Sequence, residues 1–274
     1  MAQEPETRGL REYHVMLKRT EGVVLRTIPF GEADLIVTYL TPDFGLMKLF
    51  AKSPRKIKSR FGSSLEPLTH SKISFWGKED SALPRLTQSD IIHPFQSIRE
   101  NLNCLLRISE MIELIINFVP EKEGNSRVYT LLLDTLRDIE DNLLPAAAQK
   151  IGKGGFRNED LVVNHYKIKF LEFVGFAPRL DACGRCGRNG YFFYLSHGSI
   201  LCETCAGGAD SPIKLSPAVL RFYSDLRTWD AAKIKRIRPS AALLSELSDI
   251  INIHIKYILS KPLRSEEFIH ALSR

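Results

Sequence analysis

The chain has 274 residues, of which 44% are hydrophobic, so it is long enough for about two globular domains with substantial cores. Lysine and arginine number 38 against 32 aspartate and glutamate residues, and the net charge of +6 suits a polyanionic partner. The most apolar segments contain charges and are too short to cross a bilayer, and the amino-terminal residues lack an apolar run, so we expect a soluble, cytoplasmic protein rather than a membrane or secreted one.

The first part of the chain has the pattern of strands and turns. Five short runs, separated by turns that contain Gly, Pro and Asp, cover residues 22–28, 34–41, 45–52, 69–78 and 82–92. A sheet of so many short strands avoids exposed edges by closing, so we expect a five-stranded OB-type β-barrel over residues 20–92, with an SH3-like barrel as the alternative. Residues 1–19 are expected to be a disordered extension.

From residue 93 the hydrophobic period changes to that of helices. One helix is expected over residues 95–119, with an apolar stripe made of Ile98, Leu102, Leu105, Ile108, Ile112 and Ile115. Further helices are expected over residues 128–144, 161–176, 216–229, 240–259 and 265–272. Ser216 is the expected N-cap of its helix, with Pro217 at the first helical position. The whole chain is therefore predicted to be α+β, with residues 93–180 and 211–274 forming an α-helical domain.

Four of the five cysteines form two C-x2-C pairs, fifteen residues apart, with the spacing of a zinc ribbon: Cys183, Cys186, Cys202 and Cys205. Four thiolates make a closed tetrahedral shell with no open position for water, so we expect one structural Zn²⁺ ion. The metal would supply the folding energy of a finger, residues 181–210, inserted in the helical domain. His197 is expected to be a loop residue and Cys104 a buried core thiol.

Other roles for the paired cysteines fit less well. Disulfides are not expected to persist in the reducing compartment predicted for this chain. A thioredoxin-type redox motif begins a helix after a strand, and the Gly-rich setting here does not match. A zinc-dependent nuclease would need an open metal position.

The densest positive charge lies between residues 48 and 60, without an acidic residue: Lys48, Lys52, Arg55, Lys56, Lys58 and Arg60. In the strand part, Lys48 and Phe50 fall on one face and Met47 and Leu49 on the other, and a later strand places Trp76 on a face with lysines. Basic side chains neutralise phosphates and aromatic rings stack on unpaired bases, so we predict that these cations and Trp76 bind nucleic acid. The period alone leaves open whether Phe50 and Trp76 are instead barrel core.

Sequence signatures of enzymes are scarce. The chain has no H-E-x-x-H or G-x-S-x-G motif, and its Gly-Lys-Gly-Gly segment lacks the spacing of a phosphate-binding loop. We therefore expect a binding protein with no catalytic residues.

Four stretches resemble the RecO family of bacterial DNA repair and recombination mediators: GEADLIVTYLTPDFG at 31–45, AKSPRKIKSRFGSSLEP at 51–67, FLEFVGFAPRLDACGRCG at 170–187 and KPLRSEEFI at 261–269. The resemblance implies a nucleoid-associated protein, not an enzyme, that binds single- and double-stranded DNA and anneals complementary strands.

The resemblance also implies partners. The protein would act with RecR to load the recombinase onto DNA coated with single-stranded DNA-binding protein (SSB), whose acidic C-terminal tail it would recognise. For that tail we expect a basic groove on the helical domain, with Lys167, Lys169, Arg221 and Arg227 as candidates. The alternative is an RNA-binding protein of the translation or transcription machinery with the same barrel and zinc ribbon.

Overall fold

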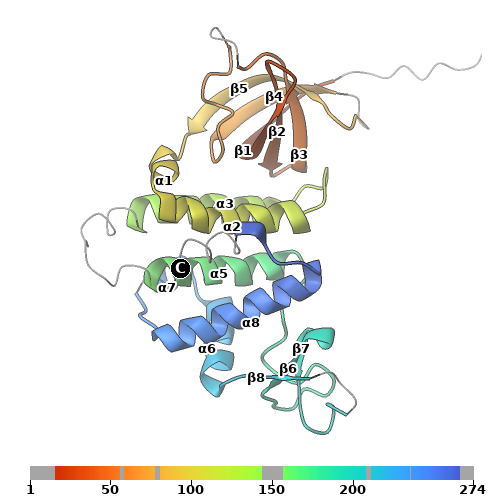
Figure 1. Ribbon diagram of the computed structural model, residues 1–274, viewed down its shortest axis with the longest axis vertical. Helices are drawn as coiled ribbons and strands as arrows, with labels where there is room; N and C mark the ends of the chain where they lie inside the picture. Colours follow the sequence, from red (N-terminus) through yellow and green to blue (C-terminus); the bar gives the residue numbers. More distant parts are fainter. Residues whose placement is uncertain are drawn as a thin grey trace, which may run out of the picture. The chain divides into compact units, whose positions relative to one another are not determined.

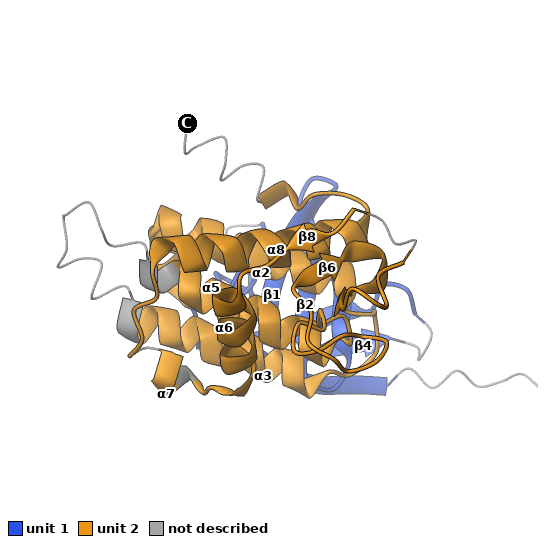
Figure 2. Cartoon of the chain, turned by 90° about the horizontal axis from the view of Figure 1, so that it is seen from below, with its two compact units in different colours: residues 1–94 blue, residues 95–274 orange. Residues whose placement is uncertain are grey.

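The computed structural model of the chain describes residues 16–55, 59–77, 81–143, 157–207, 211–234 and 236–265 (Figure 1). Contacts divide the chain into two compact units, residues 1–94 and residues 95–274 (Figure 2). Among the described residues, no helix is both long enough and apolar enough to span a membrane.

The first unit is a closed β-barrel of five strands: β1 (Met16–Phe30), β2 (Asp34–Thr41), β3 (Gly45–Ala51), β4 (His70–Gly77) and β5 (Arg85–His93). The order around the barrel is β1-β2-β3-β5-β4 (Figure 1). The length of β1 closes the sheet, because its second half pairs with β2 and its first half with β4. The remaining seam is a short parallel pairing of β3 with β5, in which Phe50 lies opposite Arg85.

Alternating residues of the strands fill the barrel. Met47, Leu49 and Ala51 of β3 are buried in one core with Val37 and Tyr39 of β2. Lys48 and Phe50 consequently point outward, as the period of two requires. The alternation predicted from the sequence is confirmed, and the partner strands decide which of its two faces lies inside.

The first strand begins earlier than the sequence predicts. Residues 16–19 were expected to belong to a disordered extension, but they pair with β4, where Leu17 lies opposite Trp76. Because Lys18 and Arg19 are adjacent charged residues, this segment does not show the apolar alternation that marks a strand in the sequence. The ammonium of Lys18 lies 5.5 Å from the ring centroid of Phe44, which allows a charged residue to lie against the barrel. The rest of the expected extension, residues 1–15, lies outside the described residues.

The second unit is mostly helical. Its helices are α1 (Gln96–Glu100), α2 (Leu102–Phe118), α3 (Ser126–Asp138) continued by the π-helix η1 (Ile139–Leu143), α5 (Arg157–Phe173), α6 (Pro217–Thr228), α7 (Ala231–Ile234) and α8 (Ala241–Leu259). The central helix is α5, which packs against α2, α3, α6 and α8. Ser216 caps α6 by accepting a hydrogen bond from the Val219 amide, with Pro217 at the first position, as predicted. The helix expected over 265–272 lies outside the described residues from residue 266 on.

The single helix expected over residues 95–119 is two helices. The backbone of Asn101 is extended (φ −103°, ψ 106°), and its side chain accepts a hydrogen bond from the amide of Cys104 to begin α2. This break shifts the buried face, so that Leu102 is 62% exposed whereas Met111 and Leu114 are buried. The predicted stripe is therefore wrong at Leu102, and Leu105 and Ile112 are only half-buried. Cys104 is buried, as expected.

A small sheet lies between α5 and α6 in the sequence. It contains β6 (Phe192–Tyr194), β7 (Ser199–Leu201) and β8 (Ile213–Lys214) in the order β7-β6-β8, with a 3-10 turn, η2 (Leu195–His197), inside its hairpin. The ring of Phe193 lies 5.7 Å from that of His254 on α8. His254 in turn bonds the Phe176 carbonyl through Nε2 at 2.9 Å, so the sheet is fixed to the helices at its base.

Candidate nucleic-acid interface and metal centre

The basic segment, residues 48–60, begins on the outer face of the barrel. Lys48 lies on the outward face of β3, and Lys52, Arg55 and Arg60 follow it; all four are exposed. The guanidinium of Arg60 lies 4.9 Å from the ring centroid of Phe61, which is buried in the barrel core. Lys56 and Lys58 lie outside the described residues.

Two hydrogen bonds fix the start of the basic segment against the turn between β1 and β2. The amide of Ser53, a residue with φ of 57°, donates to Oδ1 of Asp34 at 2.7 Å. The amide of Arg55 donates to the Ala33 carbonyl at 3.3 Å. Among the described residues, no carboxylate pairs with Lys52, Arg55 or Arg60. Lys52, Arg55 and Arg60 therefore present positive charge that no described carboxylate offsets, and the backbone before Lys56 is held at Ser53 and Arg55.

Trp76 is not a core residue. It points outward from β4 and is 48% exposed, while its neighbour Phe75 is buried in the barrel. Phe50 is half-buried on the same outer side and is likewise absent from the barrel core, so the alternative that these two aromatics are core residues is wrong. Opposite Trp76 on β5 lies Arg85, an exposed cation that sequence reasoning missed. The period-two alternation of β5 could have indicated that Arg85 points outward, because its neighbour Leu86 is apolar and buried.

The four paired cysteines come together in one cluster. Their sulfur atoms all lie within 4.8 Å of one another: Cys183, Cys186, Cys202 and Cys205. All four are free cysteines, and the sulfur atoms of Cys186 and Cys202, for example, are 3.5 Å apart, well beyond the roughly 2.05 Å of a disulfide. The disulfide alternative is therefore wrong. His197 lies outside the cluster, with Nε2 3.3 Å from the Arg185 guanidinium.

Glycines allow the chain to turn around the sulfurs. Gly187 has φ of +74°, and its amide bonds the Cys183 carbonyl to close the first turn. Gly184 lies so close to the hairpin that a Cβ would come 2.4 Å from Oγ of Ser199. The second pair is turned by amides of Cys205 and Ala206 that both bond the Cys202 carbonyl. Each pair thus directs two sulfurs to one point.

The local electrostatics favour thiolates at part of the cluster. The backbone amide of Cys202 is the main cause that lowers the pKa of Cys183 to about 6. Arg188 donates to the sulfur of Cys186 at 3.4 Å and lowers the pKa of that thiol. Hydrogen bonding with Cys186 and Cys202 raises the pKa of Cys205 to about 12, so without a cation this thiol keeps its proton. In a tetrahedral zinc site sulfurs lie about 3.8 Å apart, because Zn–S bonds are about 2.3 Å, and these four thiols fit that geometry.

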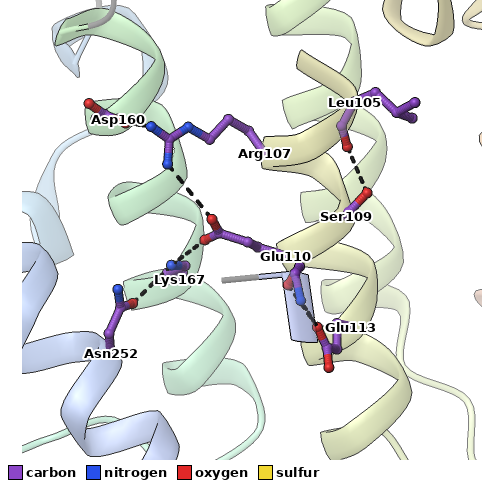
Figure 3. Close-up of polar contacts among 9 residues, drawn as sticks. Leu105, Arg107, Ser109, Glu110, Glu113, Asp160, Lys167 and Asn252 are labelled. Carbon is purple, nitrogen blue, oxygen red and sulfur yellow. Dashed lines mark hydrogen bonds and ion pairs between the residues drawn. The ribbon is translucent and has the colours of Figure 1, made fainter. Parts of the chain in front are cut away.

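A buried ion pair removes one candidate for the acidic-tail groove. The ammonium of Lys167 lies 2.6 Å from Glu110 and 2.9 Å from Oδ1 of Asn252, inside the helical unit (Figure 3). Arg107 extends the cluster by pairing with Asp160 at 2.6 Å. Burial raises the pKa of Asp160 above its usual value, and Arg107 opposes that effect. Lys167 is 2% exposed, so it is unable to line a surface groove.

Of the other three candidates for the acidic-tail groove, two have internal partners and one is exposed. Lys169 bonds the Arg227 carbonyl, and Arg227 pairs with Glu172 at 3.0 Å, so both have internal partners. Arg221 is exposed and lines an open groove of about 430 Å³ with Pro217, Ala218, Phe222, Asp225 and Leu243.

A small closed barrel with uncompensated cations, joined in one chain to helices and a four-thiol cluster, is typical of a nucleic-acid-binding protein. Two family models, Recombination protein O N terminal and Recombination protein O C terminal, match residues 16–95 and 99–267. The chain therefore belongs to the RecO family, as the four stretches of sequence predict.

Curated relatives cover nearly the whole chain. The chain is 43% identical over 246 residues to the DNA repair protein RecO of Thermodesulfovibrio yellowstonii, which is 88% of this chain and 92% of the relative. It is 30% identical over 260 residues to the protein of the same name from Dehalococcoides mccartyi, 93% of this chain and 96% of the relative. A third, from Bacillus pumilus, is 26% identical over 259 residues, 94% and 95% of the two chains. This family supports a role in DNA repair and recombination rather than in translation or transcription.

Proposed function

We propose that the protein is a recombination mediator that binds single- and double-stranded DNA and anneals complementary strands. With RecR, it helps load the recombinase onto SSB-coated DNA. The observation that carries the proposal is the exposed basic segment fixed to a closed barrel in a chain of the RecO family. It makes and breaks no covalent bond, so it is not an enzyme.

The mechanism is electrostatic. Two DNA strands repel each other through their phosphates, and cations that bind either backbone reduce this repulsion. The strand order β1-β2-β3-β5-β4 in a closed barrel supports an OB-type assignment, a fold that binds oligonucleotides on one face and its adjoining loops. Lys48, Lys52, Arg55, Lys56, Lys58 and Arg60 are proposed to bind the phosphates. Base pairing between the strands supplies the sequence specificity.

The four-thiol cluster is proposed to hold one structural Zn²⁺ ion. When bound, the metal supplies coordination energy that holds the two cysteine pairs together. Cys183, Cys186, Cys202 and Cys205 would be its ligands, and they leave no position for water. The finger, residues 181–210, would thereby keep its shape within the helical unit.

The acidic C-terminal tail of SSB is proposed to bind the groove at Arg221. Of the four cations predicted for this role, Arg221 is the exposed one, and its groove also offers the apolar side chains of Phe222 and Leu243. A cation beside an apolar surface suits a peptide that is acidic and partly apolar. Arg221→Ala is expected to weaken binding of a tail peptide, whereas Arg238→Ala, an exposed change outside this groove, leaves it unchanged.

The test of the proposed function is annealing of two complementary oligonucleotides coated with SSB, with and without RecR. We expect the full chain to accelerate pairing and RecR to alter its effect on recombinase loading. A structured RNA of equal length is the competitor. If RNA competes better than single-stranded DNA and the annealing rate equals that without protein, the proposal is wrong and the RNA-binding alternative replaces it.

A further inference from the structure

A row of large side chains crosses the outside of the barrel. Trp76 on β4 lies opposite Arg85 on β5, and Arg85 lies opposite Phe50 on β3. The ring of Phe50 contacts that of Phe30 on β1 edge to face, with centroids 5.9 Å apart. We name Phe30, Phe50, Arg85 and Trp76 the aromatic row.

Two aromatic rings of the row are exposed to solvent, although exposing large apolar side chains to water costs free energy. Phe30 is 51% and Trp76 is 48% exposed, and the neighbouring apolar residues Leu17 and Ile28 are 42% and 38% exposed. Several large apolar side chains exposed close together on the outside of a folded unit indicate a contact site.

The barrel core holds the row in place. Each of three row residues is followed or preceded in its strand by a buried residue: Phe50 by Ala51, Trp76 by Phe75 and Arg85 by Leu86. Side chains mounted on paired strands with filled interiors lose little conformational freedom when a ligand binds. The row is therefore a preorganised surface and not a flexible loop.

Cations alternate with the aromatic rings. Arg85 stands between Trp76 and Phe50 across the strands, Lys48 precedes Phe50 in β3, and Lys52 follows the end of that strand. In the part of the chain that the structure describes, no carboxylate pairs with Arg85 or Lys52. Asp34, opposite Phe30, accepts a hydrogen bond from the amide of Ser53, so its charge is partly satisfied.

A single strand of DNA matches this alternation. It presents flat apolar bases and charged phosphates in turn, and aromatic rings stack on bases whatever their sequence. In a duplex the faces of the bases are stacked on one another. A duplex can therefore present only its phosphates to the aromatic row. A purely apolar protein partner would leave the charges of Arg85 and Lys52 without compensation.

We propose that the aromatic row binds unpaired bases by stacking, so that this face of the barrel distinguishes a single strand from a duplex. This inference rests on the proposed function and divides its site in two. The basic segment contacts phosphates of both forms, and the row contacts single strands alone. Pairing of two strands removes the stacking contacts, which favours release of the annealed product.

Fluorescence of Trp76 gives a direct test in the full chain. The sequence contains two tryptophans, so Trp229→Phe leaves Trp76 as the single reporter. We expect oligo(dT) to quench and shift its emission, and a blunt hairpin duplex of equal charge to leave it nearly unchanged. Emission that does not respond while oligo(dT) binds with full affinity would overturn the inference and leave the proposed function standing.

Affinity measurements give the second readout. Trp76→Ala is expected to weaken oligo(dT) binding at least about fivefold and duplex binding less than twofold, whereas Trp76→Phe stays near the parent because a ring remains. Tyr257→Ala, which removes an exposed aromatic of α8, is the matched control for Trp76→Ala.

Three other outcomes would contradict either this inference or the proposed function. Equal losses for oligo(dT) and duplex in Trp76→Ala overturn the discrimination between the two forms. Emission that responds to a protein partner and not to oligo(dT) assigns the row to protein docking instead. Absence of binding to either DNA at low salt contradicts the proposed function itself.

Discussion

Lys167 is the residue for which sequence and structure differ most. A lysine in a helix was expected at a surface groove, but its ammonium is buried against Glu110 and Asn252 and joins α2, α5 and α8 (Figure 3). The partner helices supply the carboxylate that makes burial of the charge tolerable. Such a pairing between residues far apart in the sequence was not predictable from one chain.

Replacing Lys167 with Met tests the buried pair. The variant leaves the buried Glu110 carboxylate with Arg107, 3.7 Å away, as its remaining cationic partner, so we expect it to lose at most about 3–5 kcal/mol of unfolding free energy in urea. The double variant Lys167→Met/Glu110→Leu removes both charges and is expected to recover most of this loss. Arg137→Ala, which breaks an exposed pair with Asp134, is the control and costs less than about 1 kcal/mol. An unchanged urea midpoint for Lys167→Met would show that the pair is not buried.

Glu113 gives a prediction about pH. Burial alone raises its pKa, but hydrogen bonds from Ser265 and Arg264, together with the charge of Arg264, outweigh burial and lower the pKa below its usual value. A lowered folded-state pKa means that the stabilisation is complete above the ordinary carboxyl range and is lost as the pH falls through the folded pKa.

The Glu113→Gln variant is therefore expected to be less stable at neutral pH, by about 1 kcal/mol as for a helix cap. Thermal unfolding measured from pH 7 downward checks this, because the parent and the variant should converge in acid. A difference in Tm that stays constant over the whole range would contradict the role of the charge.

At the scale of elements, local patterns predicted the strands well and the helix boundaries less well. The strand expected over 34–41 has those bounds in the structure, since period-two alternation and flanking turns mark it. The break at Asn101 was missed because Asn also occurs inside helices, and the sequence does not show that its side chain accepts the amide hydrogen bond that begins α2. The cysteine pairs were predicted to meet at one point, and they do so because each pair carries its own turn.

Removal of zinc tests the finger as an element. We expect about one zinc per chain by elemental analysis, and a strong chelator should lower the Tm of the helical unit because metal coordination supplies roughly ten kcal/mol of apparent folding energy. Cys202→Ser should reduce stability and soluble yield more than DNA affinity. Cys104→Ser is the control for zinc content, since that thiol lies outside the cluster, and it should keep about one zinc per chain. A chain that contains no zinc and melts equally with or without chelator contradicts a structural metal.

At the scale of the whole molecule, the cations packed between helices differ from those of the basic segment. In the helical unit, Arg107, Lys167 and Arg227 are bound to carboxylates. In the barrel unit, Lys52, Arg55 and Arg60 of the basic segment are exposed, and no carboxylate among the described residues pairs with them. Composition revealed the surplus of positive charge and the sequence located it, whereas its outward direction from a closed barrel required the strand pairing.

The salt dependence of DNA binding measures whether the basic segment contacts phosphates. Removing one cation that binds a phosphate reduces the slope of log K against log salt by about 0.7 for single strands. For Arg55→Ala/Lys56→Ala/Lys58→Ala/Arg60→Ala we therefore expect weaker binding to every sequence tested and a slope that is shallower by up to about 3. A variant with the slope of the parent chain would contradict the account, because the basic segment would then not contact the phosphates.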